Sequence, residues 1–187
     1  MLIKKIIQLC KKQKKIILYD SEDVQYISDG AAVYPLHGMP VFDEKSILTA
    51  FDIAGDKIEV QRFGTPPAMF DLGDSDAAEI HVEGPLLVVG DNVPYLTSVG
   101  VRFIEREHLA PFADEKVIDI YERSTPNGDV YFVVKKGFLV LGAISAKFVL
   151  TVEWMKRLMK LETNCRKTFI TMTGGLTPSE CEPEEFV

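Results

Sequence analysis

The stretch VQYISDGAAVYPLHGMP, residues 24–40, contains two short runs rich in Val, Ile and Tyr that are separated by Asp29 and Gly30. An Asp-Gly pair is preferred at the centre of a type I′ turn, because both central residues of that turn need a positive φ. Residues 24–36 are therefore predicted to form a β-hairpin. Pro35 cannot donate a hydrogen bond to a neighbouring strand, which places it at a strand end or on an edge. His37 follows the second strand, and we expect a hydrogen-bonded structural histidine there.

Before the hairpin, residues 1–15 predict an amphipathic helix followed by a strand at residues 15–19. Ile3, Ile6, Ile7 and Cys10 recur at helical spacing, so they lie on one stripe while lysines occupy the opposite face. The favoured interpretation is a helix that covers the core and exposes its lysines to solvent. The alternative is a strip that faces phosphate groups or a membrane surface, and the candidate phosphate-facing residues are Lys4, Lys11 and Lys15. Cys10, on the apolar stripe, is expected to be buried and unreactive.

Further along the chain, the patterns predict an α+β fold. We expect a helix that begins at Asp43 and is ended by Gly55, and a later helix that begins at Thr151. A short helix is expected near residues 92–98. Strands are expected at residues 57–63, 80–89, 101–106, 117–122, 130–135, 138–144 and 167–172. The aromatic side chains expected in the core of these strands and the hairpin are Tyr26, Tyr34, Phe132 and Phe138.

An internal repeat is a further prediction. The segments that begin at Asp23 and Asp129 align with four identities, and in each half a hairpin leads to a helix. The predicted organisation is two related halves, each with a hairpin-rich antiparallel sheet and helices packed on one side. The corresponding boundaries are residues 1–70 for the first unit, 71–79 for an acidic loop, 80–172 for the second unit and 173–187 for a flexible tail.

Charge and cysteine content limit the classes of function. The net charge is −7, yet residues 1–15 hold six lysines and no acid. The rest of the chain is strongly acidic, which disfavours general affinity for nucleic acid but leaves a local basic strip. An odd number of cysteines, the absence of an export-signal pattern and the short apolar runs predict a cytoplasmic protein without membrane spans or disulfides.

The most site-like group of residues is the stretch FDLGDSDAAEIH, residues 70–81. It contains Asp71, Asp74, Asp76, Glu79 and His81, and carboxylate oxygens are suitable ligands for hard cations. The spacing does not fit the EF-hand loop, so a solvated acidic linker is the favoured interpretation. A nucleophilic pair of Cys10 and His37 is disfavoured as well, since the chain has no nucleophile-elbow or phosphate-loop motif. We therefore expect no catalytic residue, no cofactor and no bound metal.

Two resemblances add an expected context. The stretch LYDSEDVQYISDGAAVYPLHGMP, residues 18–40, resembles small uncharacterised proteins of bacterial prophages and other mobile elements, which implies a genomic origin but no activity. The order of IKKIIQLC, KIILYD, VQYISDG and AAVYPL resembles, in outline, one subdomain of the DNA sliding clamps. That resemblance implies a replication accessory protein whose lysines face DNA.

These patterns lead to three hypotheses about function. The first is a non-enzymatic binding or assembly protein of phage origin, which associates with a protein partner or with itself through a sheet edge or an apolar face. The second is a clamp-like DNA accessory protein that uses the N-terminal lysines. The third is a metal-dependent hydrolase that uses Asp71, Asp74, Asp76 and His81.

Overall fold

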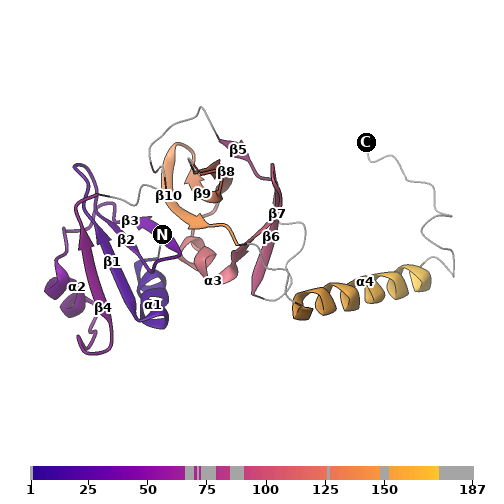
Figure 1. The fold of residues 1–187 in the computed structure, drawn as a ribbon, viewed down its shortest axis with the longest axis horizontal. Helices are drawn as coiled ribbons and strands as arrows, with labels where there is room; N and C mark the ends of the chain where they lie inside the picture. Colours follow the sequence, from indigo (N-terminus) through magenta and orange to yellow (C-terminus); the bar gives the residue numbers. More distant parts are fainter. Residues whose placement is uncertain are drawn as a thin grey trace. The chain divides into compact units, whose positions relative to one another are not determined.

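The computed structural model describes residues 2–65, 70, 72, 79–84, 91–125, 127–147 and 152–172, the last range with side chains from residue 156 onward. It confirms the α+β class: helices accompany one large mixed sheet and one small two-stranded sheet (Figure 1). The chain divides into two compact units, Met1–Phe148 and Val149–Val187, and this division differs from the boundaries expected from the sequence. Among the described helices, none has both the length and the apolar character needed to cross a bilayer.

The first unit is built on an eight-stranded sheet with the order β4-β1-β2-β3-β10-β9-β8-β5. Its strands are β1 (Lys15–Tyr19), β2 (Tyr26–Ser28), β3 (Ala32–Pro35), β4 (Glu59–Phe63), β5 (Ile80–His81), β8 (Asp119–Ser124), β9 (Val130–Lys136) and β10 (Leu139–Ser145). The edge strand β4 runs parallel to β1, and the other neighbours are antiparallel. Because β3 pairs with β10, the strands of both sequence halves belong to one sheet; the duplication itself stays a prediction.

The β2–β3 hairpin is confirmed, but the predicted turn type is wrong. Ser28 pairs with Val33, so the connection is longer than a two-residue turn. Gly30 has a φ of 99°, whereas Asp29 is not among the residues with positive φ. Instead, the Asp29 side chain accepts hydrogen bonds from the backbone N–H groups of Ala31 and Ala32, each at 2.9 Å. The aspartate therefore shapes the turn through its carboxylate.

The amphipathic N-terminal helix is also confirmed, as α1 (Ile3–Gln13). Its apolar stripe is buried, with Ile6 and Cys10 completely inaccessible, and its lysines face outward. The helix ends at Lys14, which adopts a left-handed conformation with a φ of 54° before β1 begins. α1 packs against β1, against α3 (Arg106–Leu109) and against the short 3-10 helix η2 (Ala110–Phe112). These helices therefore cover the same part of the sheet.

The helix α2 (Glu44–Ala50) begins as predicted and ends earlier than predicted. Asp43 caps it through a reciprocal pair of hydrogen bonds with Ser46, at 2.7 and 2.8 Å. Gly55 was expected to end the helix, but the backbone leaves the helix after Ala50, and Asp52 takes a positive φ of 49°. The turn is thus made by Asp52, a residue type that tolerates this conformation through its short polar side chain.

Two other elements differ from the expectation. Residues 92–98 were expected to be helical, but β6 (Asn92–Thr97) pairs with β7 (Gly100–Glu105) to form the small sheet. Residues 167–172 were expected to form a strand, yet they complete the helix α4 (Val152–Met172). Of the expected strand at residues 80–89, Ile80 and His81 form β5, and residues 82–84 are not in a strand. Residues 85–90 lie outside the described part of the chain. The capping role of Thr151 also lies outside it.

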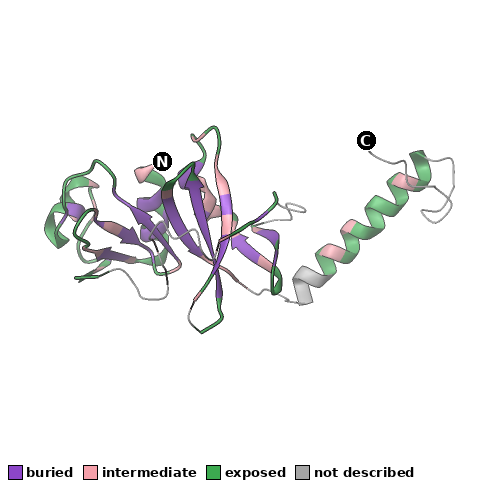
Figure 2. Cartoon of the chain, turned by 90° about the horizontal axis from the view of Figure 1, so that it is seen from above, coloured by how far each residue is buried: buried purple, intermediate pink, exposed green. Residues whose placement is uncertain are grey.

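The core occupies both faces of the large sheet, because side chains alternate along its strands. Figure 2 shows buried residues along these strands. Phe132 and Val134 of β9 lie in the larger apolar cluster, together with Ile6, Tyr34 and Phe112. A smaller cluster holds Val33, Phe70, Tyr131, Val133 and Ala143. Of the four aromatic residues expected in the core, Tyr34 and Phe132 are buried and Tyr26 is half-buried, but Phe138 is exposed.

Gly142 provides a test of how tightly the seam between β3 and β10 is packed. A Cβ atom at this position would lie 3.0 Å from Tyr34 Cδ1, 3.1 Å from Phe112 Cζ and 3.1 Å from the backbone oxygen of Val33. We expect Gly142→Ala to lose about 1–3 kcal/mol through overpacking, more than the ~0.4–1 kcal/mol that such a change gains through the unfolded chain. Urea unfolding measures the difference.

Gly84→Ala is the matched control, because no atom of the described residues lies within 4 Å of a Cβ added there and its φ is not positive. Its unfolding midpoint should equal or slightly exceed that of the wild type. Equal midpoints for Gly142→Ala and Gly84→Ala would contradict tight packing at the seam.

Candidate functional site

The residues after β3 and the turn between β9 and β10 lie side by side at one end of the sheet. The reason is the antiparallel pairing of Val33 with Ala143: β3 runs toward the end of the sheet at which β10 begins. His37 follows β3, and its Nε2 lies 3.4 Å from the backbone oxygen of Val140. The imidazole is exposed, so it forms part of a surface as well as joining two strands.

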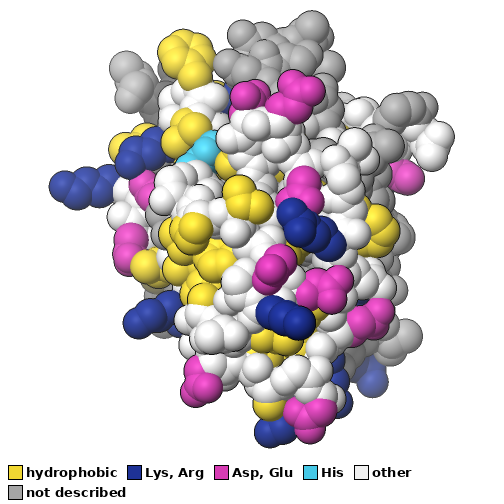
Figure 3. All heavy atoms as spheres, turned by 90° about the vertical axis from the view of Figure 1, so that its left-hand side faces the viewer, with side chains coloured by type: hydrophobic (Ala, Val, Ile, Leu, Met, Phe, Trp, Pro, Cys, Tyr) yellow, Lys and Arg dark blue, Asp and Glu magenta, His cyan; other side chains and the backbone are white. Residues whose placement is uncertain are grey.

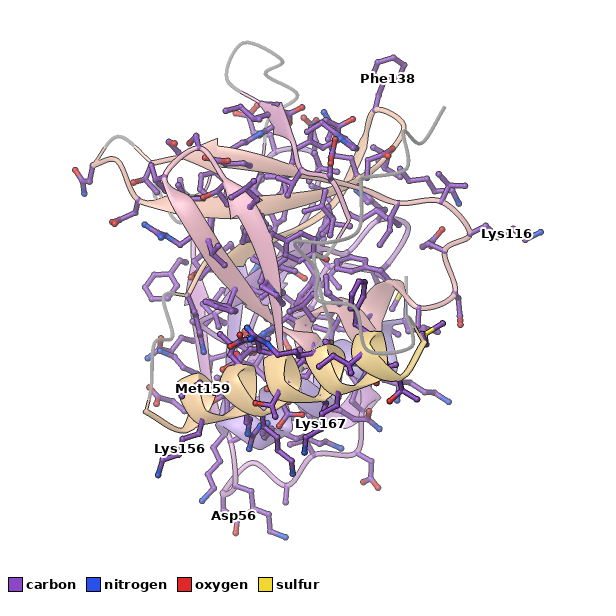
Figure 4. The ribbon with its side chains drawn as sticks, turned by 90° about the vertical axis from the view of Figure 1, so that its right-hand side faces the viewer. Asp56, Lys116, Phe138, Lys156, Met159 and Lys167 are labelled. Carbon is purple, nitrogen blue, oxygen red and sulfur yellow. The ribbon has the colours of Figure 1, made fainter. Side chains whose placement is uncertain are left out.

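Apolar side chains gather on one side of His37. Phe138 is 83% exposed at the β9–β10 turn, and its neighbour Leu139 is 48% exposed. Figure 4 shows Phe138 projecting outward beyond the end of the ribbon. A notch of about 180 Å³ lies here, lined by Tyr26, Pro35, His37, Leu72, Phe138, Leu139 and Val140. An aromatic side chain this exposed has a large unfavourable contact with water, which association with another molecule would remove.

Acidic side chains gather on the other side of His37, in a pocket of about 390 Å³ that also includes Met39 and Val41. Asp20, Glu22 and Asp23 line it together with Arg62. The Arg62 Nε lies 2.7 Å from Asp20 Oδ2, and this hydrogen bond lowers the pKa of the Asp20 carboxyl group. We call the notch and the pocket together the His37 surface. On the face drawn in Figure 3, hydrophobic side chains lie beside an exposed histidine.

The helix α4 presents a second apolar surface. Its stripe, defined by residues at helical spacing, consists of Leu158, Leu161, Cys165, Phe169 and Met172. Lys156, Lys160 and Lys167 lie on the opposite side of the helix, and Figure 4 shows Lys156 and Lys167 directed to the same side. α4 has five basic and two acidic residues, a net charge of +3. Most of its described side chains are exposed (Figure 2).

A buried hydrogen bond joins a histidine and a carboxylate in the interior near α3. His108 Nε2 is 2.9 Å from Asp29 Oδ2, and both side chains are almost completely inaccessible. Burial raises the pKa of the Asp29 carboxyl group, but the hydrogen bonds from His108 and from the N–H groups of Ala31 and Ala32 outweigh that effect. The pKa therefore lies below its ordinary value of 3.8. Tyr34 Oη donates to the His108 backbone oxygen at 3.2 Å, so the pair is part of a wider polar cluster.

Cys10 lies beside this cluster, where its thiol contacts the Ser28 backbone oxygen at 3.7 Å. Burial, and then the nearby charge of Asp29, raise the pKa of the thiol far above its ordinary value. The thiolate that nucleophilic chemistry needs is thus disfavoured. The expectation that Cys10 is buried is confirmed. The two partners of this buried hydrogen bond, Asp29 and His108, were not expected from the sequence, since 79 residues separate them and no motif links them.

The three lysines of the predicted phosphate-facing strip differ in exposure. Lys4 and Lys11 are exposed on α1, and Lys15 is half-buried at the start of β1. Lys11 and Lys14 line an open groove of about 940 Å³ together with Lys57, but Asp52 and Asp56 line it too. The groove therefore has mixed charge. The role of these lysines toward phosphate groups stays a prediction.

Of the candidate ligands in the acidic stretch, the structure describes Glu79 and His81. Asp71, Asp74 and Asp76 lie outside the described residues. Glu79 is buried against Arg123, whose Nε is 2.8 Å from its Oε1, and against Lys135, whose Nζ is 3.1 Å from its Oε2. His81 is exposed, lies 3.7 Å from Asp119 and packs edge-on against the Tyr121 ring. Glu79 therefore belongs to a buried ion cluster on the sheet.

Comparison with known proteins gives no relative: no family model, no curated protein and no solved structure matches the chain.

The Asp29–His108 pair generates a prediction about stability and pH. Asp29→Asn retains an oxygen for the Ala31 and Ala32 N–H groups but removes the charge that His108 contacts, so we expect a loss of about 2 kcal/mol at neutral pH. Because the folded pKa of Asp29 is depressed, its contribution is fully present above the ordinary value of 3.8 and is lost as the pH falls through the lower folded value. Urea unfolding between neutral and acidic pH measures both effects.

The variant should lose less stability than the wild type across this acidic window. Asp114→Asn is a control at an exposed carboxylate outside the His37 surface and should follow the wild-type profile. A wild-type-like acid dependence in Asp29→Asn would contradict the assigned role of the pair.

Proposed function

We propose that this protein is a non-enzymatic assembly protein, in which α4 of one copy binds the His37 surface of another. The observation that carries the proposal is the exposure of Phe138, which lines the apolar notch beside His37, while acidic side chains line the pocket on the other side of that histidine. Soluble proteins seldom expose contiguous apolar surface unless it binds something. Leu139 at 48%, Met39 at 39% and Val41 at 71% exposure extend the apolar area around His37.

The shape of the His37 surface suits an amphipathic helix. The notch of about 180 Å³ is small, with room for one large side chain of a partner. Single anchoring side chains of this kind dominate the binding energy of protein interfaces. The apolar stripe of α4 extends from Leu158 to Met172, about 21 Å at 1.5 Å per residue. It offers leucine, phenylalanine and methionine side chains at helical spacing, which is the usual way in which a helix enters a groove.

Charge favours the same pairing. α4 carries +3, whereas the unit Met1–Phe148 has 16 basic and 22 acidic residues, a net charge of −6. Glu22 and Asp23 lie in the pocket beside His37, where they face an incoming basic helix. Opposite charges on the two surfaces speed association and disfavour wrong partners. Two α4 helices, by contrast, repel each other because both are basic.

Each copy contributes one helix and one His37 surface, and these surfaces differ from each other. Such a head-to-tail interface forms a ring if the rotation between copies closes, and an open chain if it does not. We therefore expect oligomers that grow with protein concentration, rather than a single symmetric dimer.

The origin of the chain in a prophage or other mobile element stays a prediction, which rests on the resemblance of residues 18–40. The clamp-like alternative also stays a prediction, supported by the exposure of Lys4 and Lys11 on α1. The assembly hypothesis is preferred because both of its proposed surfaces expose apolar side chains.

The test combines two single variants that each remove one surface. Phe138→Glu places a charge on the His37 surface, and Leu161→Glu places one on the α4 stripe. Each should weaken association at least about tenfold, since a central apolar anchor contributes more than about 1.4 kcal/mol. Light scattering coupled to size-exclusion chromatography, over a range of concentrations, measures the oligomers. Leu96→Glu and Thr163→Glu are matched controls, because Leu96 is exposed on the small sheet and Thr163 lies on the other side of α4.

Mixing the two variants distinguishes head-to-tail binding from pairing of α4 with α4. The Phe138→Glu copy retains an intact helix and the Leu161→Glu copy retains an intact His37 surface, so the mixture should form a heterodimer that stops growing. A wild-type protein that stays monomeric at every concentration, or a mixture that fails to associate, would contradict the proposal.

A further inference from the structure

A group of side chains at the start of α3 has the composition and spacing of a cation site. Glu105, Glu107 and His108 each direct a ligand atom to one place, and these atoms all lie within 4.8 Å of one another. The His108 Nδ1 is 3.5 Å from Glu105 Oε2. Ligand atoms around a tetrahedral zinc ion are about 3.3 Å apart, given bonds of about 2.0–2.1 Å. The histidine and Glu105 are therefore already close to the required separation.

The orientation of the His108 imidazole supports a cation site independently of the spacing of the ligand atoms. The side chain is 1% exposed, and its Nε2 is held by Asp29. A carboxylate can only accept, so Nε2 carries the hydrogen and Nδ1 faces Glu105. Within the described part of the chain, Nδ1 has no hydrogen bond, and the Glu105 carboxylate at 3.5 Å is its nearest charged partner. A carboxylate behind a histidine, with the other ring nitrogen directed at further carboxylates, is the usual arrangement around a metal-bound histidine.

The site also has solvent access. Glu105 and Glu107 line an open pocket of about 420 Å³ with Lys12, Asp91 and Asn92. This opening leaves room for a water molecule as a fourth ligand, beside three protein ligands.

In the structure, a lysine contacts each of the two glutamates, Glu105 and Glu107. Lys12 Nζ is 2.6 Å from Glu107 Oε2, and Lys147 Nζ is 2.6 Å from Glu105 Oε1. The Lys12 side chain is 64% exposed and that of Lys147 is 39% exposed, so each can turn into solvent at little cost. Cys10 is buried near Asp29 and does not join the group of ligands. The lysines therefore compete with a cation but do not block it.

We propose that Glu105, Glu107 and His108 bind a divalent transition-metal ion, with zinc as the best match to one imidazole and two carboxylates, and that Asp29 orients the histidine. The ion would attach the end of β7 to α3. This site differs from the Asp71, Asp74, Asp76 and His81 set expected from the sequence, and it is independent of the assembly proposal.

The test measures Zn²⁺ binding to the full chain by calorimetry, with the absorption spectrum of bound Co²⁺ as a second readout. Substituting His108 would disturb the core, so the informative variants are Glu105→Gln and Glu107→Gln. Each should weaken Zn²⁺ binding at least about tenfold, because loss of even an outer-shell partner has an effect of that size. Wild-type protein should also gain thermal stability with added Zn²⁺, and both variants should lose this gain.

Two controls locate the ion. Glu115→Gln breaks a comparable lysine pair, between Glu115 and Lys136 at 2.7 Å, and should leave Zn²⁺ affinity unchanged. Cys165→Ser removes an exposed thiol and should also leave it unchanged. Absence of Zn²⁺ binding by the wild type, binding that both glutamate variants retain, or binding that Cys165→Ser removes would each overturn the proposal.

Discussion

The buried contact between Asp29 and His108 is the constraint on which much of the first unit depends. It joins the β2–β3 turn to α3, and the same aspartate fixes the turn through two backbone N–H groups. Tyr34 attaches β3 to the His108 backbone, and Cys10 attaches α1 to Ser28. A charge in the interior is tolerated only when it is paired and hydrogen-bonded, so this cluster admits one arrangement of hairpin and helices. The β2–β3 hairpin is thereby held in the position in which β3 pairs with β10.

Local signals in the sequence predicted local structure well. The stripe of α1, the capping residue Asp43 and the β2–β3 hairpin were all correct, because each depends on neighbours within a few residues. The predicted turn type was wrong because the Asp29 carboxylate is held by a hydrogen bond with His108, which is distant in sequence. β6 was missed because its pairing with β7 decides its conformation, and α4 continues to Met172 because no strand lies beside residues 167–172 among the described pairings.

The two apolar surfaces were harder to predict than the core. Phe138 sits in a run that reads as a buried strand, yet the β9–β10 turn carries it beyond the sheet into solvent. Periodicity identifies an apolar stripe on a helix but does not say how far anything covers it; on α4, Cys165 and Met172 are exposed, whereas Leu158, Leu161 and Phe169 are half-buried. The candidate metal ligands share this difficulty. Glu105, Glu107 and His108 are close in sequence, but Asp29 and the pocket that make them notable come from elsewhere in the chain.

The pairing of β3 with β10 sets the order in which the chain acquires its structure. Ala32 and Val33 find their partners only at Ile144 and Ala143, more than a hundred residues later. During synthesis, β1, β2 and β3 are made long before β10. Until β10 is made, the edge of β3 that pairs with it has unpaired backbone groups. Contacts of such wide sequence separation slow folding, because a long loop must close before they form. The nascent protein is thus exposed to mispairing with other chains until residue 145 has left the ribosome, which makes the middle of its sheet the last part to become safe from aggregation.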